Sequence, residues 1–329
     1  MMNKKLYLLV LLMAGVFANV TDIHAVQTPT GKSRIIIASN VKARSAPNVN
    51  GEEVMKLGIG TIVSEGEPSL EKAKIAGKED YWYRVGLPDG KDGWVFGGFT
   101  QPFDENKRAA IYKQIADERL KLEEMSYADA TDLFRFLSSA VKEMKTPADA
   151  ATIELAKLLA LHKTALTIQS DQQEQEPYKT FLKTNEASLI YSEPAGSWFL
   201  NTDALWNLHK KYATLPVAER IAWAAAQNPV GGECEGYVPC HVARINITIG
   251  RYLKLYPQGA HAAEALTQIS EEAQSLIEYA KDSTEKPTAE ERKEAAPEFA
   301  ALRATLAKVT DAKKAATVQV LTKLEQLYR

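Results

Sequence analysis

The residues best suited to chemistry are two cysteines that lie close together in the second half of the chain. Cys234 and Cys240 are the only cysteines among the 329 residues, and they stand in the segment Gly-Gly-Glu-Cys-Glu-Gly-Tyr-Val-Pro-Cys-His, which ends at His241. In an exported protein such a pair forms a disulfide by default. The bond would close a short loop, 234–240, between two helices and would stabilise the fold by about 2–3 kcal/mol.

A metal or haem site at the same place is an alternative. Cys234, Cys240 and His241 offer thiol and imidazole ligands, but their spacing is not C-x-x-C-H, and no further Cys/His pair completes a zinc set. The chain also lacks the H-E-x-x-H, G-x-G-x-x-G, P-loop and G-x-S-x-G patterns. We therefore expect no metal, no cofactor and no enzymatic activity.

The first 25 residues provide the context that favours a disulfide. Lys4 and Lys5 precede an uninterrupted apolar run from Leu6 to Phe17. The run is shorter than the roughly 20 residues that a membrane-spanning helix needs, and it is typical of a signal peptide. We expect residues 1–25 to be removed and the mature chain to be periplasmic or secreted, without a membrane span. An uncleaved anchor is the alternative.

The composition is that of an ordinary globular protein. Lys and Arg number 40 against 42 Asp and Glu, and 45% of the residues are hydrophobic. At roughly 150 residues per domain, the length corresponds to about two domains. The near-neutral charge argues against nucleic acid as a partner, because electrostatic binding to phosphates needs a clear basic excess.

Residues 34–100 have the pattern of short strands separated by turns. Aromatic and β-branched runs such as Tyr81–Val85 and Gly93–Phe96 alternate with turns that carry Asn, Pro and Gly. This density of strands and turns predicts a small barrel or sandwich.

The same region resembles the bacterial SH3 (SH3b) domain. The segments that carry the resemblance are Val41-Lys-Ala-Arg-Ser-Ala-Pro47, Gly60-Thr61, Trp82-Tyr-Arg-Val85 and Asp89-Gly-Lys-Asp-Gly-Trp-Val95. The chain departs from the family pattern at Ala46, which replaces a glycine, and in an insertion over 68–78 that is expected to lengthen the loop before Tyr81. The resemblance implies an SH3-like β-barrel with a ligand groove, and both departures bear on that groove.

Aromatic and arginine side chains of this region are the candidate ligand-binding residues. Strand alternation puts Trp82 on one face and Tyr81 and Tyr83 on the other. We expect Trp82 and Trp94 to fill the core, which leaves other aromatic residues near the surface. The proposed set is Tyr81, Tyr83, Arg84, Phe99 and Arg44. Aromatic rings beside guanidinium groups suit an anionic peptide or a glycan, so the expected partner is peptidoglycan or an envelope peptide.

From residue 104 onward the pattern becomes helical. Apolar residues at helical spacing predict a helical region over 104–185 and helical hairpins over 186–329, with a loop or short hairpin near 185–200. Helices are expected at 203–212, 217–227, 241–256, 260–280, 289–309 and 311–328. The segment Tyr256-Pro-x-Gly-x-x-Ala-x-x-Ala265 resembles tetratricopeptide-like hairpins, which bind protein partners.

These features predict a multi-domain α+β protein, in which an SH3-like β-barrel precedes a mainly α-helical, tetratricopeptide-like region. The expected function is non-catalytic binding or scaffolding in the bacterial cell envelope. A cell-wall cysteine peptidase or other hydrolase is one alternative, because Glu-Cys-Glu-Gly-Tyr237 faintly resembles the D-C-S-G-F nucleophile segment of cell-wall peptidases. Against it, the chain has helical pattern where those enzymes carry a Gly-His on a strand. A purely structural envelope protein is another alternative.

Overall fold

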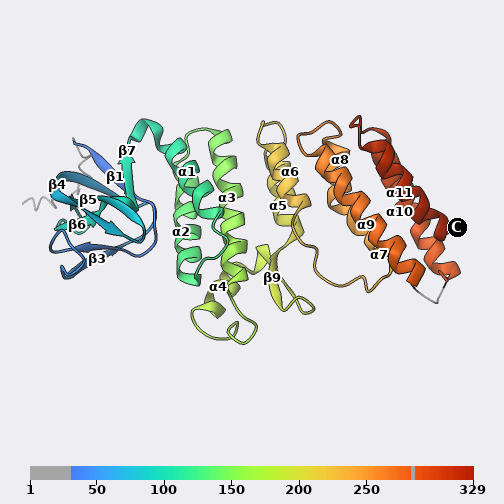
Figure 1. Cartoon of the computed structure of the whole chain (residues 1–329), viewed down its shortest axis with the longest axis horizontal. Coiled ribbons are helices and arrows are strands. Elements are labelled where there is room, and N and C mark those ends of the chain that lie inside the picture. Colours follow the sequence, from blue (N-terminus) through green and yellow to red (C-terminus); the bar gives the residue numbers. More distant parts are fainter. Residues whose placement is uncertain (1–30, 283–285) are drawn as a thin grey trace, which may run out of the picture.

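The computed structural model describes residues 31–282 and 286–329. The molecule is elongated, with a β unit at one end and helices standing side by side from there to the C-terminus (Figure 1). This arrangement of a β unit followed by helices confirms the predicted α+β class. The predicted signal peptide, residues 1–25, lies outside the described residues. Within the described residues, no helix combines the length and the apolar character that crossing a membrane requires.

The β unit is one curled antiparallel sheet of seven strands that forms an open half-barrel. The strands are β1 Ser33–Ile36, β2 Val41–Arg44, β3 Glu53–Leu57, β4 Ile62–Ile75, β5 Lys78–Gly86, β6 Asp92–Phe96 and β7 Thr100–Phe103. Their order in the sheet is β3-β2-β6-β5-β4-β1-β7. Aliphatic side chains that alternate along the strands, among them Val41, Ala43, Val85 and Val95, fill the inner core.

The expected insertion loop over 68–78 is wrong, because these residues extend a hairpin. β4 continues to Ile75, and its last four residues pair with the start of β5. Ala76 and Gly77 form the connection with positive φ angles of 49° and 78°, a conformation that glycine adopts without strain. The Glu- and Lys-rich composition resembles a loop because most side chains of this part of the hairpin are exposed.

Eleven α-helices follow the β unit within the described residues. The elements after β7 are α1 Arg108–Leu120, α2 Tyr127–Glu143, α3 Pro147–Leu166, α4 Tyr178–Thr184, β8 Leu189–Ser192, β9 Ser197–Leu200, α5 Thr202–Lys211, α6 Ala218–Ala226, α7 Val238–Ile247, α8 Ile249–Leu255, α9 Ala262–Asp282, α10 Ala289–Ala307 and α11 Lys314–Leu327. Their starts follow local rules: Thr146 caps α3 by accepting from the Asp149 N–H at 3.1 Å, with Pro147 in the first turn.

Two differences from the predicted helices have local causes. The helix expected over 241–256 is divided into α7 and α8 at Thr248, whose φ and ψ are −109° and −100°. The Thr248 hydroxyl donates to the Arg244 carbonyl at 2.6 Å, and a Cβ on Gly250 would lie 2.9 Å from the Ile245 oxygen. The segment 185–200 contains the antiparallel hairpin of β8 and β9, which was one of the two expected forms.

The β unit and the first helices share a hydrophobic core. Ile35 and Ile59 of the β unit belong to one buried cluster with Leu133 and Phe136 of α2. The Ile59 N–H also donates to Asp132 Oδ2 at 2.9 Å. Continuous packing of this kind couples the predicted regions 34–100 and 104–185 mechanically.

Candidate functional site

An aromatic cleft of about 200 Å³ lies in the β unit. We use the name aromatic cleft for the cavity lined by Ala38, Ser39, Asn40, Val41, Lys42, Arg44, Val49, Ile75, Trp82, Phe96 and Phe99. All of these residues belong to the β unit, and none of them belongs to the core that the β unit shares with the helices. The cleft is therefore formed without any contribution from the helical region.

The deepest wall of the aromatic cleft consists of three aromatic rings. Trp82 and Phe96 are directly opposite each other on β5 and β6, and their rings meet edge to face at 5.8 Å. Phe99 packs edge to face on Phe96 at 5.3 Å. Trp82 is 3% exposed and Phe96 1% exposed, whereas Phe99 is half-buried. Two fixed rings thus support a third that is accessible to a ligand.

The rim of the aromatic cleft is cationic. Lys42 and Arg44 alternate with buried residues on β2 and so point to the same side of the strand. Lys42 pairs with Glu53 at 2.9 Å, and this hydrogen bond lowers the pKa of the Glu53 carboxyl. The Arg44 Nη1 donates to the Gly51 carbonyl at 2.7 Å. No acidic residue is among those that line the cleft in the described chain, but Glu53 lies opposite Arg44 across β2 and β3, so an anion in the cleft would share the guanidinium with Glu53 and the Gly51 carbonyl.

The turn between β1 and β2 adds an unsatisfied polar group. The Ser39 Oγ atom is buried and has no hydrogen-bond partner among the described residues. A buried hydroxyl without a partner costs about 1–3 kcal/mol. The next residue, Asn40, has a φ of 53°, which is uncommon for residues other than glycine and often marks functional sites. A ligand that bonds to Ser39 Oγ would recover this cost.

The structure brings two of the five proposed ligand-binding residues into the cleft. Arg44 and Phe99 line it, and Tyr81, Tyr83 and Arg84 do not. Arg84 instead pairs with Glu67 at 3.3 Å and with Asp92 at 2.8 Å. The Lys72 amine lies 5.4 Å from the Tyr81 ring centroid, and the Arg34 guanidinium lies 3.9 Å above the Tyr83 ring. These three side chains therefore have partners of their own within the β unit.

The alternation predicted for β5 is present, but its two faces are both covered. Tyr83 packs toward the inner core that contains Val85. Trp82 is buried on the opposite face, where Ile75 at the hairpin tip and Phe99 close over it. The sequence carries only weak signals for the cleft residues that the prediction missed. Asn40 is a residue type that tolerates a positive φ. The pairing of Trp82 with Phe96 can be recognised only when the strand register is known.

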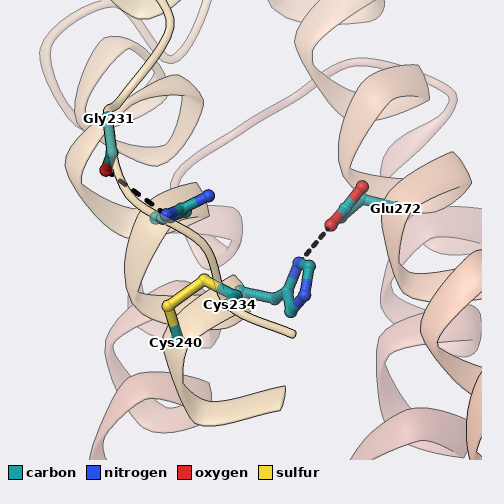
Figure 2. The surroundings of a disulfide bond; sticks show 6 residues. Gly231, Cys234, Cys240 and Glu272 are labelled. Atoms are coloured by element: carbon teal, nitrogen blue, oxygen red, sulfur yellow. Dashed lines mark hydrogen bonds and ion pairs between the residues drawn. A yellow bond between two sulfur atoms is a disulfide. The ribbon is translucent and has the colours of Figure 1, made fainter. Parts of the chain in front are cut away.

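The two cysteines lie within disulfide distance, as predicted, with Cα atoms 5.5 Å apart. Cys240 is in the first turn of α7, and Cys234 is 6% exposed in the preceding loop. Beside them the His241 Nδ1 atom lies 2.8 Å from Glu272 Oε1. Figure 2 marks this interaction by the dashed line that ends at Glu272. Among the described residues, no group of three or more His, Cys, Asp and Glu side chains is arranged to hold a metal ion. The arrangement ties the loop to α7.

Comparison of the chain with models of known protein families, with curated proteins and with solved structures gives no match. The function is therefore argued from the aromatic cleft, the disulfide and the residues themselves.

Proposed function

We propose that this protein is a non-catalytic binding protein of the bacterial cell envelope. In this proposal the aromatic cleft binds a short anionic peptide segment, such as the peptide part of peptidoglycan, and the helical region binds a protein partner. The observation that carries the proposal is an accessible Phe99 ring on a rigid aromatic wall, with Arg44 and the unpartnered Ser39 Oγ beside it. Aromatic contact would supply affinity, and the two polar groups would orient a carboxylate.

The dimensions of the cleft support a peptide over a glycan. Its volume of about 200 Å³ is below the roughly 300–1,000 Å³ of pockets that enclose a drug-sized ligand. One side chain together with its carboxylate fits such a space, whereas a disaccharide would remain largely outside it.

The architecture supports an SH3b-like β unit followed by tetratricopeptide-like hairpins. The curled antiparallel sheet has its turns and aromatic strands in the order of the family's segments. The pairs α5 with α6 and α8 with α9 follow the order of the helical hairpins expected over 203–227 and 241–280. A disulfide-distance cysteine pair fits an oxidising compartment such as the periplasm.

The peptidase alternative needs a free thiolate at Cys234 and a neighbouring imidazole base. Cys234 is bonded to Cys240 and buried, and the nearest sequence histidine, His241, is hydrogen-bonded to Glu272. These contacts support the binding function over the hydrolytic one.

Sedimentation of the full chain with purified peptidoglycan tests the proposal. We expect Phe99→Ala to weaken binding about tenfold, which corresponds to 1.4 kcal/mol. Arg44→Ala should have a smaller effect, because an ion pair at a wet rim contributes about 0–1 kcal/mol. Matched controls are Tyr81→Ala and Arg84→Ala, which lie outside the cleft. If all four variants remain folded and bind like the wild type, or if the controls bind as weakly as Phe99→Ala, the proposed site is wrong.

A further inference from the structure

A second cavity lies in the helical region, where α1 ends before α3 does. α1 has 13 residues and α3 has 20, so at 1.5 Å per residue α3 is longer by about 10 Å. Beyond Leu120, the last turns of α3 face residues 121–126, the loop that leads to α2, and Tyr127, the first residue of α2. This leaves a groove of about 740 Å³, at the end of the α1–α3 bundle.

The floor of the groove is apolar and helical in its spacing. Leu159, His162 and Leu166 follow one another along one face of α3, at i, i+3 and i+7. Met125 and Tyr127 form the facing wall. Leu166 is 45% exposed. A face of this kind usually packs against another helix.

His162 adds an unsatisfied polar atom to the groove. Its Nε2 atom is buried and has no hydrogen-bond partner among the described residues, while the ring lies edge to face against Phe199 of β9 at 6.1 Å. An incoming polar side chain can give this nitrogen the partner that it lacks.

The rim of the groove carries unpaired negative charge. Glu123 and Glu124 are exposed and form no ion pair among the described residues. The one cation in the groove, Lys163, donates to the Leu122 carbonyl. A basic residue on a ligand would therefore find two carboxylates that form no ion pair with any side chain among residues 31–282 and 286–329.

We propose that this groove binds a short amphipathic helix of a partner protein, which packs its apolar face on Leu159 and Leu166 and places a basic residue near Glu123 and Glu124. The inference rests on the proposed partner-binding role of the helical region. The groove is separate from the aromatic cleft. If the groove binds no helix, the sedimentation of the chain with peptidoglycan should still be as proposed above.

Two synthetic amphipathic peptides of about 18 residues, longer than the roughly 12–15 residues below which isolated helices are marginal in water, test this proposal. One carries Leu on one face and Lys on the other, and the second has Glu in place of every Lys. Fluorescence anisotropy with the full chain should give about tenfold tighter binding of the Lys peptide. The double variant Glu123→Lys, Glu124→Lys should reverse that preference.

Further variants separate the groove from the rest of the surface. Leu166→Glu should weaken binding of the Lys peptide about tenfold, whereas the matched control Leu327→Glu, at a residue 40% exposed on α11, should leave it unchanged. His162→Phe should weaken binding severalfold without lowering the melting temperature of the free protein. Equal binding of both peptides, equal effects of Leu166→Glu and Leu327→Glu, or a dimer that Leu166→Glu dissociates would each overturn the proposal.

Discussion

Replacing Gly60 with alanine tests the packing that joins the β unit to the helices. The substitution adds two costs, the strain of a left-handed backbone conformation and a clash with a ring of α2. Gly60 has a φ of 84°, and a Cβ there would lie 2.1 Å from Phe136 Cδ2 and 2.6 Å from Phe136 Cε2. The left-handed conformation costs an L-residue about 1–2 kcal/mol. Displacing a packed ring costs about 1–3 kcal/mol more. The free energy of unfolding should therefore fall by about 2–5 kcal/mol.

Gly77→Ala is the matched control for this substitution. Gly77 has a φ of 78°, but a Cβ there has no neighbour within 4 Å, so only the conformational cost of about 1–2 kcal/mol applies. Urea unfolding followed by far-UV circular dichroism measures both variants. In a Phe136→Ala background, the cost of Gly60→Ala should shrink to that of Gly77→Ala. The shared core would be refuted if Gly60→Ala and Gly77→Ala lower the free energy of unfolding equally in the wild-type background. It would also be refuted if Gly60→Ala keeps its full effect in the Phe136→Ala background.

Three further predictions concern buried or constrained groups. Cys240→Ser should lower the free energy of unfolding by about 2–3 kcal/mol by opening the loop to Cys234, and an identical effect of reducing agent on the variant and the wild type would contradict this. Glu65→Ala should cost about 3 kcal/mol in urea unfolding, because it strands the 6%-exposed Arg34, whose Nη1 lies 2.9 Å from Glu65 Oε2; a loss below about 1 kcal/mol, the range of surface pairs, would disprove the role of the pair. Burial lowers the pKa of His162 below its ordinary value of 6.5, so stability is full above that value and is lost as the pH falls through the lower folded-state pKa. The melting temperature of His162→Phe should therefore fall less than that of the wild type on acidification, and parallel curves would argue against it.

Local patterns were sufficient to predict most helices and the alternation of the strands. Pro147 is typical of the first turn of a helix, and α3 begins at this residue. The division at Thr248 was not predictable in the same way, because it depends on the close approach of Gly250 to the Ile245 carbonyl.

The aromatic cleft could be predicted only in part, because it depends on contacts between distant segments. Arg44 and Phe99 belong to side-chain types that suit an anionic peptide, and the structure brings both to the cleft. The role of Ser39 depends on the absence of a neighbour for its hydroxyl. The burial of Trp82 depends on Ile75, at the end of a hairpin whose composition resembles a loop.

A charge placed at the mouth of the aromatic cleft tests the central claim most directly. Val49 lines the cleft and is 56% exposed, whereas Leu70 on β4 is fully exposed and lies outside the lining; both sites should tolerate glutamate without unfolding. We predict that Val49→Glu abolishes sedimentation of the full chain with peptidoglycan, because the carboxylate repels an anionic ligand and occupies Arg44, and that Leu70→Glu sediments like the wild type. Equal sedimentation of the two variants would contradict binding in the aromatic cleft.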